Sequence, residues 1–138
     1  MVRQMEDNDI GIILNYLSEE FDHVPNKEGI LATLHYTLDS AKYRYVLETE
    51  EGLLIGYYVY NEITKNIADL SSVFIAPKYR HTKYARELWG HGAKSLYKYK
   101  LVKCSTVTSS QLMPKKYYNK HTKLFNIKKL YKKVVYNG

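Results

Sequence analysis

One segment in the middle of the chain, residues 67–99, constrains the fold more than any other. It opens with the apolar run IADLSSVFIA, which is typical of a buried strand, and Pro77 ends this strand. From Thr82 to Tyr99, small and apolar residues then recur at helical spacing along one side. The segment therefore predicts a buried strand that turns directly into a packed helix, as in α/β domains.

The rest of the chain adds strands and helices on both sides of this unit. Asp7 to Asp9 supply a helix start, and apolar side chains follow at helical spacing. The predicted strands are 2–5, 42–50, 52–63, 67–76, 101–109 and 128–136, and the predicted helices are 7–21, 27–39, 82–99 and 114–125. This order, β-α-α-β-β-β-α-β-α-β, predicts an α/β fold: one mixed sheet with flanking helices, in a single domain of residues 1–138.

The charge of the chain is unevenly distributed. Residues 1–87 contain nine Lys and Arg and all fourteen acidic residues, a net charge of −5, whereas residues 88–138 contain twelve lysines and no acid. This asymmetry predicts an anionic partner, either nucleic acid, a membrane surface or a phosphate-rich cofactor. The alternative is a coding bias toward lysine and tyrosine, since the chain has fifteen tyrosines.

Other bulk features indicate a cytoplasmic protein without a membrane segment. No run of eighteen apolar residues is present, and the first residues include acids where a secretion signal would be basic and then apolar. The single Cys104 cannot form an internal disulfide, which fits a reducing compartment. The five histidines are scattered, and no cluster has metal-ligand spacing, so we expect no metal site.

The turn after the central strand is a candidate anion site on electrostatic grounds alone. A helix that begins in a tight turn presents unpaired backbone N–H groups, and its dipole adds partial positive charge there. Lys78, Arg80, His81 and Lys83 surround this turn. The turn therefore favours a negatively charged ligand, and pyrophosphate is a natural example.

The residues around this turn, together with the order of elements, resemble the GNAT superfamily of N-acetyltransferases over nearly the whole chain. The stretch ADLSSVFIAPKYRHTKYARELW is similar to the family's central strand, its V-x-P-x-Y-R turn and the helix that follows. Ile75 takes the valine position, and Pro77 and Tyr79 match. Arg80 opens the family's R-x-x-G-x-G/A loop and Ala85 closes it. The run GLLIGYYVYNE is likewise similar to the family's third strand, and the resemblance implies a GNAT-like fold.

The resemblance implies that acetyl-coenzyme A binds at this turn, and that a backbone N–H of the central strand holds the developing oxyanion. The implied coenzyme-binding residues are Val73, Phe74, Ile75, Arg80, His81, Lys83, Tyr84 and Ala85. Lys83 stands where the family's loop has its first glycine. Two hypotheses follow: Lys83 replaces backbone contacts to phosphate with a charged contact, or its side chain obstructs the phosphate and the site no longer holds coenzyme A.

The resemblance also implies a base that removes a proton from the acceptor amine. Asp69 is the candidate, because it lies on the central strand at a place where family members often carry an acid. The alternative is that Asp69 is a surface carboxylate that solubilises the start of the strand. His35 and Glu48 are further candidates for the amine side of the site.

An acid that protonates the departing thiolate is the other implied group. The segment TKLFNIKKLYKKV resembles the family's closing L-Y-x-x-x-G-F pattern, with Phe125 at the tyrosine and Lys129 at the glycine. Phenylalanine has no proton to donate. Tyr118 is therefore the candidate acid, although seven residues of the predicted helix would place it roughly 10 Å from Phe125.

Two classes of function remain open from the sequence. The first is an acyl-CoA-dependent N-acetyltransferase that acts on an amine of a protein, a small molecule or a nucleic acid. The second is a catalytically degenerate GNAT-like domain that binds nucleic acid or serves as a phage structural or interaction protein. The second is favoured by the basic C-terminal half, where YKYKLVK and PKKYYNKHTK mix lysines with aromatic residues that stack on bases. Small GNAT-like proteins of this size are encoded by bacteriophages, in which case the location is the host cytoplasm.

Overall fold

The computed structural model describes residues 1–104, 115–119 and 121–136. Its strands are β1 (Val2–Gln4), β2 (Tyr43–Glu48), β3 (Leu54–Thr64), β4 (Ile67–Ile75), β5 (Leu101–Lys103), β6 (Tyr118–Asn119) and β7 (Leu124–Phe125). Its helices are α1 (Asp7–Glu20), α2 (Lys27–Ser40), α3 (Lys83–Leu96) and α5 (Ile127–Tyr131), with 3₁₀ turns η1 (Pro77–Tyr79) and η2 (Lys115–Tyr117) and a π-helical segment η3 (Lys132–Tyr136) that continues α5. No helix in these ranges is long and apolar enough to cross a membrane.

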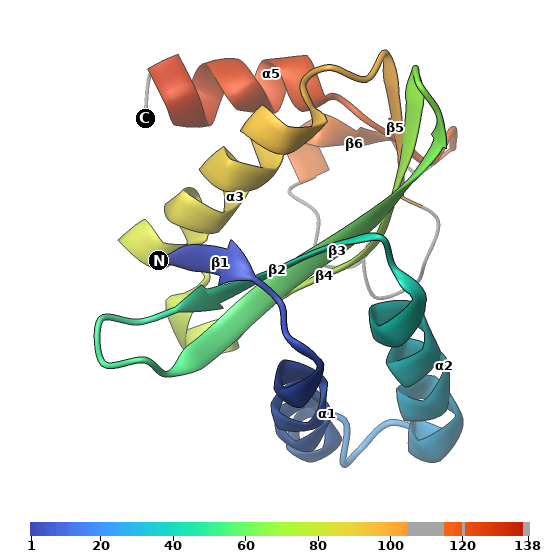
Figure 1. The fold of residues 1–138 in the computed structure, drawn as a ribbon, viewed down its shortest axis with the longest axis vertical. Helices are drawn as coiled ribbons and strands as arrows, with labels where there is room; N and C mark the ends of the chain where they lie inside the picture. The colour runs from blue at the N-terminus through green and yellow to red at the C-terminus, as the bar shows by residue number, and fades with distance from the viewer. Residues whose placement is uncertain (105–114, 120, 137–138) are drawn as a thin grey trace.

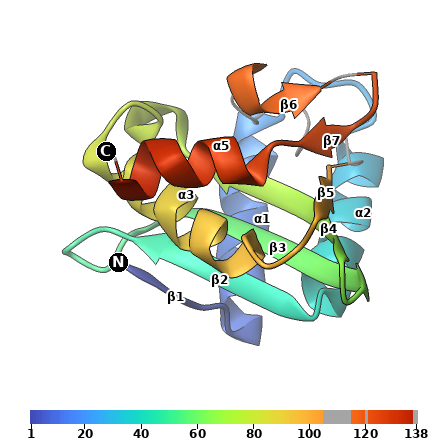
Figure 2. The same ribbon diagram turned by 90° about the horizontal axis from the view of Figure 1, so that it is seen from above.

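A seven-stranded sheet forms the middle layer of the described residues (Figure 1). Its strand order is β1-β2-β3-β4-β5-β7-β6, and the neighbouring strands are antiparallel except for β4 and β5. Helices α1 and α2 cover one face, and α3 and α5 cover the other (Figures 1 and 2). This arrangement confirms the predicted fold class, a mixed sheet with helices on its flanks.

Strand β4 contains an irregularity that opens one edge of the sheet. Leu70 and Ser72 pair with successive residues of β3, so Ser71 is an extra residue in β4. A bulge of this kind bends the strand and increases its twist. The ladder between β4 and β5 covers Ile67–Asp69, and beyond the bulge β4 has no β5 partner within the described residues. Within the described residues, the edge of β4 that faces β5 is therefore open after the bulge.

An ion-pair cluster joins β1 to α1 and β2. Arg3 donates to the two carboxylate oxygens of Asp9 at 2.8 and 2.9 Å, and its Nε donates to Glu48. Asp9 also accepts the backbone N–H of Glu6 at 2.7 Å, at the start of α1. The hydrogen bonds from Arg3 lower the pKa of Asp9 below its ordinary value, although burial opposes the shift. The cluster therefore stabilises the charged form of a buried carboxylate.

We expect Asp9→Asn to destabilise the protein at neutral pH by roughly 1.5–3 kcal/mol, a typical loss for hydrogen bonds to a charged group. Because folding lowers the pKa of Asp9, its contribution is fully present above the unfolded-state pKa of about 3.9 and is lost as the pH falls through the folded-state pKa. The difference between variant and native protein should therefore shrink below about pH 4 in urea unfolding measured at several pH values. The control is Asp7→Asn, because Asp7 pairs with Arg44 but is 83% exposed. Equal losses in the two variants would contradict the prediction.

The C-terminal part of the chain differs from the predicted elements. The predicted helix 114–125 is wrong, because residues 115–125 contain η2 and the antiparallel pair β6 and β7. Asn119 initiates the intervening turn, since its side chain accepts the backbone N–H groups of His121 and Thr122. Lys123 then adopts a left-handed conformation with a φ of 57°, which returns the chain into β7.

The predicted final strand, 128–136, is also wrong, because these residues lie in α5 and η3. The side chain of Asn126 accepts the backbone N–H of Lys129 at 3.0 Å and so caps a helix at this point. Ile127 and Leu130, three residues apart, are both buried, as one face of a helix requires. The predicted strand 101–109 is confirmed over β5, and its residues 105–109 lie outside the described residues.

Candidate functional site

The link between β4 and α3 is a short hydrogen-bonded turn. Pro77 begins η1, where its fixed φ suits the first helical position. Thr82 caps α3, because its hydroxyl accepts the backbone N–H of Tyr84 at 3.3 Å. The same hydroxyl donates to the carbonyl oxygen of Tyr79 at 2.8 Å. These contacts fix the start of α3 relative to the end of β4.

Arg80 joins this turn to the strand. Its Nε donates to the carbonyl oxygen of Ile75 at 2.8 Å, and its guanidinium lies 5.8 Å from the centre of the Phe74 ring. A guanidinium has five N–H donors, so this hydrogen bond leaves others for an anion. Arg80 is therefore both oriented by the strand and able to bind a phosphate.

Lys83 lies at the first position of α3 and directs its ammonium group toward the turn between β2 and β3. Its Nζ is 3.1 Å from Oε1 of Glu50, and the two side chains are 71% and 75% exposed. Among the described residues other than glycine, positive φ angles occur only at Asn26 and Lys123. Lys83 therefore needs none of the conformational freedom of a glycine, and its side chain is already engaged outside the turn.

A cavity of about 710 Å³ lies beside the turn. Its walls come from β4, the turn, α3, η2 and the C-terminal helical segment, and the lining residues are Val73, Ile75, Arg80, His81, Thr82, Lys83, Ala85, Arg86, Trp89, Tyr117, Leu130, Lys133 and Val134. Four of these lining residues are lysine or arginine and none is acidic. The cavity combines positive charge with an apolar wall, which suits a ligand that carries both phosphates and an uncharged arm.

The open edge of β4 supplies backbone donors next to this cavity. The N–H of Ala76 donates to the carbonyl oxygen of Ile55 on β3 at 2.8 Å. Successive residues of a strand point their N–H groups to opposite edges. The N–H groups of Ile75 and Val73 therefore face the open edge, whereas that of Phe74 faces β3.

The structure brings together most of the predicted coenzyme-binding residues. Those in the lining of the cavity are Val73, Ile75, Arg80, His81, Lys83 and Ala85. Phe74 and Tyr84 lie outside this lining. The Phe74 ring packs against Tyr16 of α1, at 5.7 Å between ring centres, and the Tyr84 ring meets Tyr79 edge-on at 5.7 Å. Phe74 therefore packs β4 against α1, and Tyr84 packs against Tyr79 of the turn.

The predicted base and acid lie outside the cavity lining. Asp69 is six residues before Ile75, which corresponds to roughly 20 Å along β4, and its Oδ2 accepts a hydrogen bond from the Ser71 hydroxyl at 3.2 Å. The hydroxyl of Tyr118 donates to the carbonyl oxygen of Cys104 at 3.2 Å. Asp69 thus lies far along β4 from the turn and Tyr118 lies outside the cavity lining, and their catalytic roles stay predictions.

The further base candidates also lie outside the cavity lining. Glu48, the last residue of β2, accepts a hydrogen bond from Arg3 of the edge strand β1. His35 is exposed on α2, which covers the face opposite to α3. Both side chains therefore face parts of the molecule other than the cavity.

Tyr117 is a residue of the cavity that the sequence reasoning missed. It is 9% exposed and lines the cavity, and its ring meets the Phe125 ring edge-on at 6.4 Å. Tyr117 ends η2 and Tyr118 begins β6, and only Tyr117 of the two lines the cavity. The two adjacent tyrosines are visible in the sequence, but the predicted helix 114–125 led to Tyr118 as the candidate acid.

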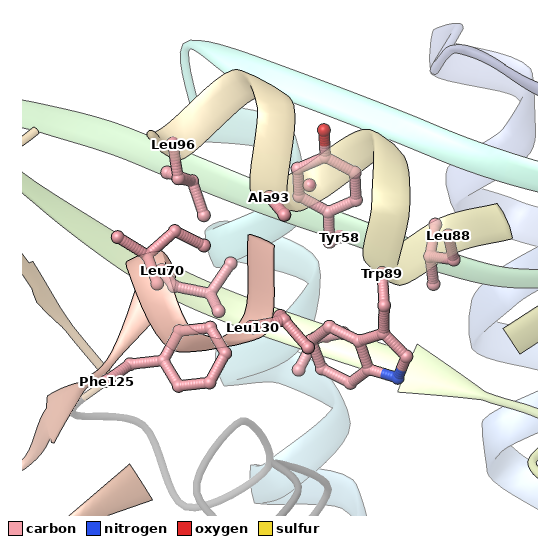
Figure 3. A pocket seen from close by; sticks show the side chains of 11 residues that line it. Tyr58, Leu70, Leu88, Trp89, Ala93, Leu96, Phe125 and Leu130 are labelled. Carbon is pink, nitrogen blue, oxygen red and sulfur yellow. The ribbon is translucent and has the colours of Figure 1, made fainter. Parts of the chain in front are cut away.

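Phe125 is a core residue in the structure. A small second cavity, with room for about one water molecule, is lined by Tyr58, Leu70, Val73, Leu88, Trp89, Gly92, Ala93, Leu96, Phe125, Ile127 and Leu130 (Figure 3). Figure 3 shows Leu130 between Phe125 and Trp89. Val73, Trp89 and Leu130 line both cavities and so form the wall between them. Phe125 thus supports this wall from behind and stays out of the lining of the larger cavity.

A buried polar network holds α3 against the sheet. The Tyr58 hydroxyl is 2.6 Å from Nδ1 of His91 and donates to the hydroxyl of Ser95 at 3.0 Å. Burial raises the pKa of Tyr58 and lowers the pKa of His91. Burial thus favours the neutral form of both groups.

The sequence of residues 11–121 matches the model of the acetyltransferase (GNAT) family. This match includes β4, the turn, α3 and all the predicted coenzyme-binding residues. A comparison with the curated proteins found no match.

Several solved structures share the fold. A chimera of the spermidine N-acetyltransferase SpeG from Vibrio cholerae and hSSAT is 21% identical with a TM-score of 0.52, over 75% of this chain and 68% of that chain. The GNAT family N-acetyltransferase YhbS from Escherichia coli, in complex with CoA, is 18% identical with a TM-score of 0.55, over 75% and 61%. A GNAT family acetyltransferase from Brucella melitensis, in complex with acetyl-CoA, is 16% identical with a TM-score of 0.56, over 77% and 75%. At these identities the likeness is one of fold.

Proposed function

This chain belongs to the acetyltransferase (GNAT) family, and we propose that it is an acyl-CoA-dependent N-acetyltransferase that transfers an acetyl group to an amine. The observation that carries the proposal is the cavity at the β4–α3 turn, which has four cationic side chains and no acidic one in its lining. The complexes of YhbS with CoA and of the Brucella melitensis protein with acetyl-CoA, which share the fold, support the same ligand class.

The lining residues of the cavity fit coenzyme A. Arg80 and Arg86 offer planar guanidinium groups, which can bind phosphate oxygens in pairs. The start of α3, capped by Thr82, adds the partial positive charge of a helix N-terminus. Val73 and Trp89 supply an apolar wall for an uncharged arm. Together these groups match the pyrophosphate and pantetheine portions of the coenzyme.

The chain can contribute to acetyl transfer in three ways. Bound acetyl-coenzyme A would supply an acyl group that is activated as a thioester. The N–H of Val73 or Ile75, at the open edge of β4, can stabilise negative charge on the carbonyl oxygen. The hydroxyl of Tyr117 can donate a proton to the leaving sulfur. We keep Asp69 as the proposed base, although its position four residues from Val73, roughly 13 Å along the strand, requires a relay through water.

The proposed acceptor is an amine of a protein, a small molecule or a nucleic acid. A ligand that binds only the folded protein stabilises it by about 2.7 kcal/mol at a hundredfold excess over its Kd. We therefore expect acetyl-CoA to raise the melting temperature, and we expect release of free CoA thiol with an amine from a panel of spermidine, a lysine peptide and glucosamine. No shift with millimolar acetyl-CoA would remove the proposal. A shift without turnover on any amine would leave a coenzyme-binding domain that is not an acetyltransferase for these acceptors.

A second candidate function is nucleic-acid binding by the surface of Tyr97, Lys98, Lys128 and Tyr131. Tyr97 is 45% exposed, its ring centre is 4.4 Å from that of Tyr131, and Nζ of Lys128 is 5.5 Å from the Tyr97 ring. Lysines beside exposed aromatic rings suit phosphates and stacked bases. Absence of a gel shift with single-stranded and duplex DNA at low salt would exclude this candidate.

A further inference from the structure

The larger cavity has a wall that comes from the C-terminal end of the described chain. Leu130, Lys133 and Val134, from α5 and η3, line the cavity opposite the β4–α3 turn. Figures 1 and 2 show α5 beside α3 on the same side of the sheet, and Leu130 packs with residues of both α3 and β4 around the small cavity. The C-terminal segment therefore helps to enclose a site whose other walls belong to the central strand, turn and helix.

This wall is held in place by packing against α3. Ile127 and Leu130 are 3% and 2% exposed, and both line the small apolar cavity behind the wall. The Tyr131 ring lies 4.4 Å from the Tyr97 ring at the end of α3. The backbone that follows these anchors is therefore held beside the cavity, and Lys133 lies on it two residues after Tyr131.

Lys133 is the charged residue that this wall contributes to the cavity lining. Its ammonium group has no ion-pair partner within residues 1–104, 115–119 and 121–136, whereas Lys83 on the opposite side pairs with Glu50. Arg80 and Arg86 act from the α3 side. An anion between these walls is thus within a cavity that has cations on two sides.

We propose that Lys133 binds a phosphate group of the coenzyme from the side opposite the turn, so that the C-terminal helical segment closes the coenzyme site. This inference rests on the proposed function for the identity of the ligand. It assigns to Lys133 the charged contact to phosphate that one of the two sequence-based hypotheses gave to Lys83. It also gives a function to the basic segment KKLYKKVV, which the resemblance to the family's closing strand left unexplained.

The test compares Lys133→Ala with Lys132→Ala by titration calorimetry, using acetyl-CoA and inorganic pyrophosphate as probes. The two variants lose the same charge one residue apart, but Lys132 is exposed and lies outside the cavity lining. We expect Lys133→Ala to lower the affinity for both probes by about tenfold, a typical value for one charge-assisted hydrogen bond. We expect Lys132→Ala to change these affinities by less than about twofold. We expect Lys133→Arg to have most of the native affinity. S-acetyl-pantetheine, which has no pyrophosphate, should bind Lys133→Ala and native protein alike.

Equal losses in Lys133→Ala and Lys132→Ala would overturn the inference, because they would indicate general electrostatic attraction. Unchanged affinity in Lys133→Ala would overturn it as well. If the native protein binds pyrophosphate but not acetyl-CoA, the proposed function fails, while the comparison with pyrophosphate still decides the role of Lys133. If it binds neither probe, both proposals are wrong. Melting temperatures of the variants without ligand should equal the native value, since the side chain of Lys133 is exposed.

Discussion

Tyr117→Phe is expected to lower kcat for acetyl transfer by about 100-fold while it leaves the Kd for acetyl-CoA within about twofold, because general acid catalysis contributes 10²–10⁴-fold. Tyr117 lines the larger cavity, is buried, and meets the Phe125 ring edge-on, so phenylalanine should keep its packing. What the substitution removes is the proton donor. Steady-state kinetics together with titration calorimetry separate the loss of turnover from any loss of binding.

Tyr118→Phe is the competing experiment, because the sequence pattern predicts Tyr118 as the acid. In the structure its hydroxyl donates to the carbonyl oxygen of Cys104 and lies outside the cavity lining. A large loss of kcat in Tyr118→Phe, with Tyr117→Phe near native activity, would return the role to Tyr118. Tyr36→Phe, which changes an exposed tyrosine on α2, is the control for handling and expression.

The central strand, turn and helix could be predicted because their signals are local. Pro77 ends the strand because it has no backbone N–H, and Thr82 begins the helix because its hydroxyl caps it. β4 is a largely apolar run of nine residues, and the apolar side chains of α3 repeat at helical spacing over fourteen residues. Since the predicted coenzyme-binding residues belong to this unit, most of them line one cavity.

The C-terminal part could not be predicted because its signals are short and its structure depends on distant contacts. β6 and β7 have two residues each, too few for a period to show. α5 has five residues, too few for their spacing to exclude a strand, and packing of Leu130 against α3 residues favours the helix. Tyr117 and Lys133 reach the cavity through this packing, so neither residue spacing nor the pair YY assigns them to it without the fold.

Arg80→Ala is expected to weaken acetyl-CoA binding by about 100-fold, the effect of losing a paired guanidinium contact to phosphate. The melting-temperature shift with acetyl-CoA should then nearly vanish at ligand concentrations that saturate the native protein. Arg80 also donates to the carbonyl oxygen of Ile75, so Arg80→Lys, which keeps the charge, should recover part of the affinity. The control is Lys78→Ala, which removes a cation from the same turn but from outside the cavity lining. A native-like shift in Arg80→Ala would mean that the turn does not bind the pyrophosphate.

Lys83→Gly separates the two hypotheses about the loop in the same titration. If the Lys83 ammonium has become a phosphate ligand, the variant should bind acetyl-CoA about tenfold more weakly, and if it obstructs the phosphate the variant should bind more tightly. The structure favours a third result, a change of less than about threefold, because the ammonium group already pairs with Glu50 and both side chains are exposed. Glu50→Gln frees Lys83 without removing it. An increase in affinity of Glu50→Gln that is absent from the double variant with Lys83→Gly would show that the ion pair with Glu50 holds the lysine away from the coenzyme.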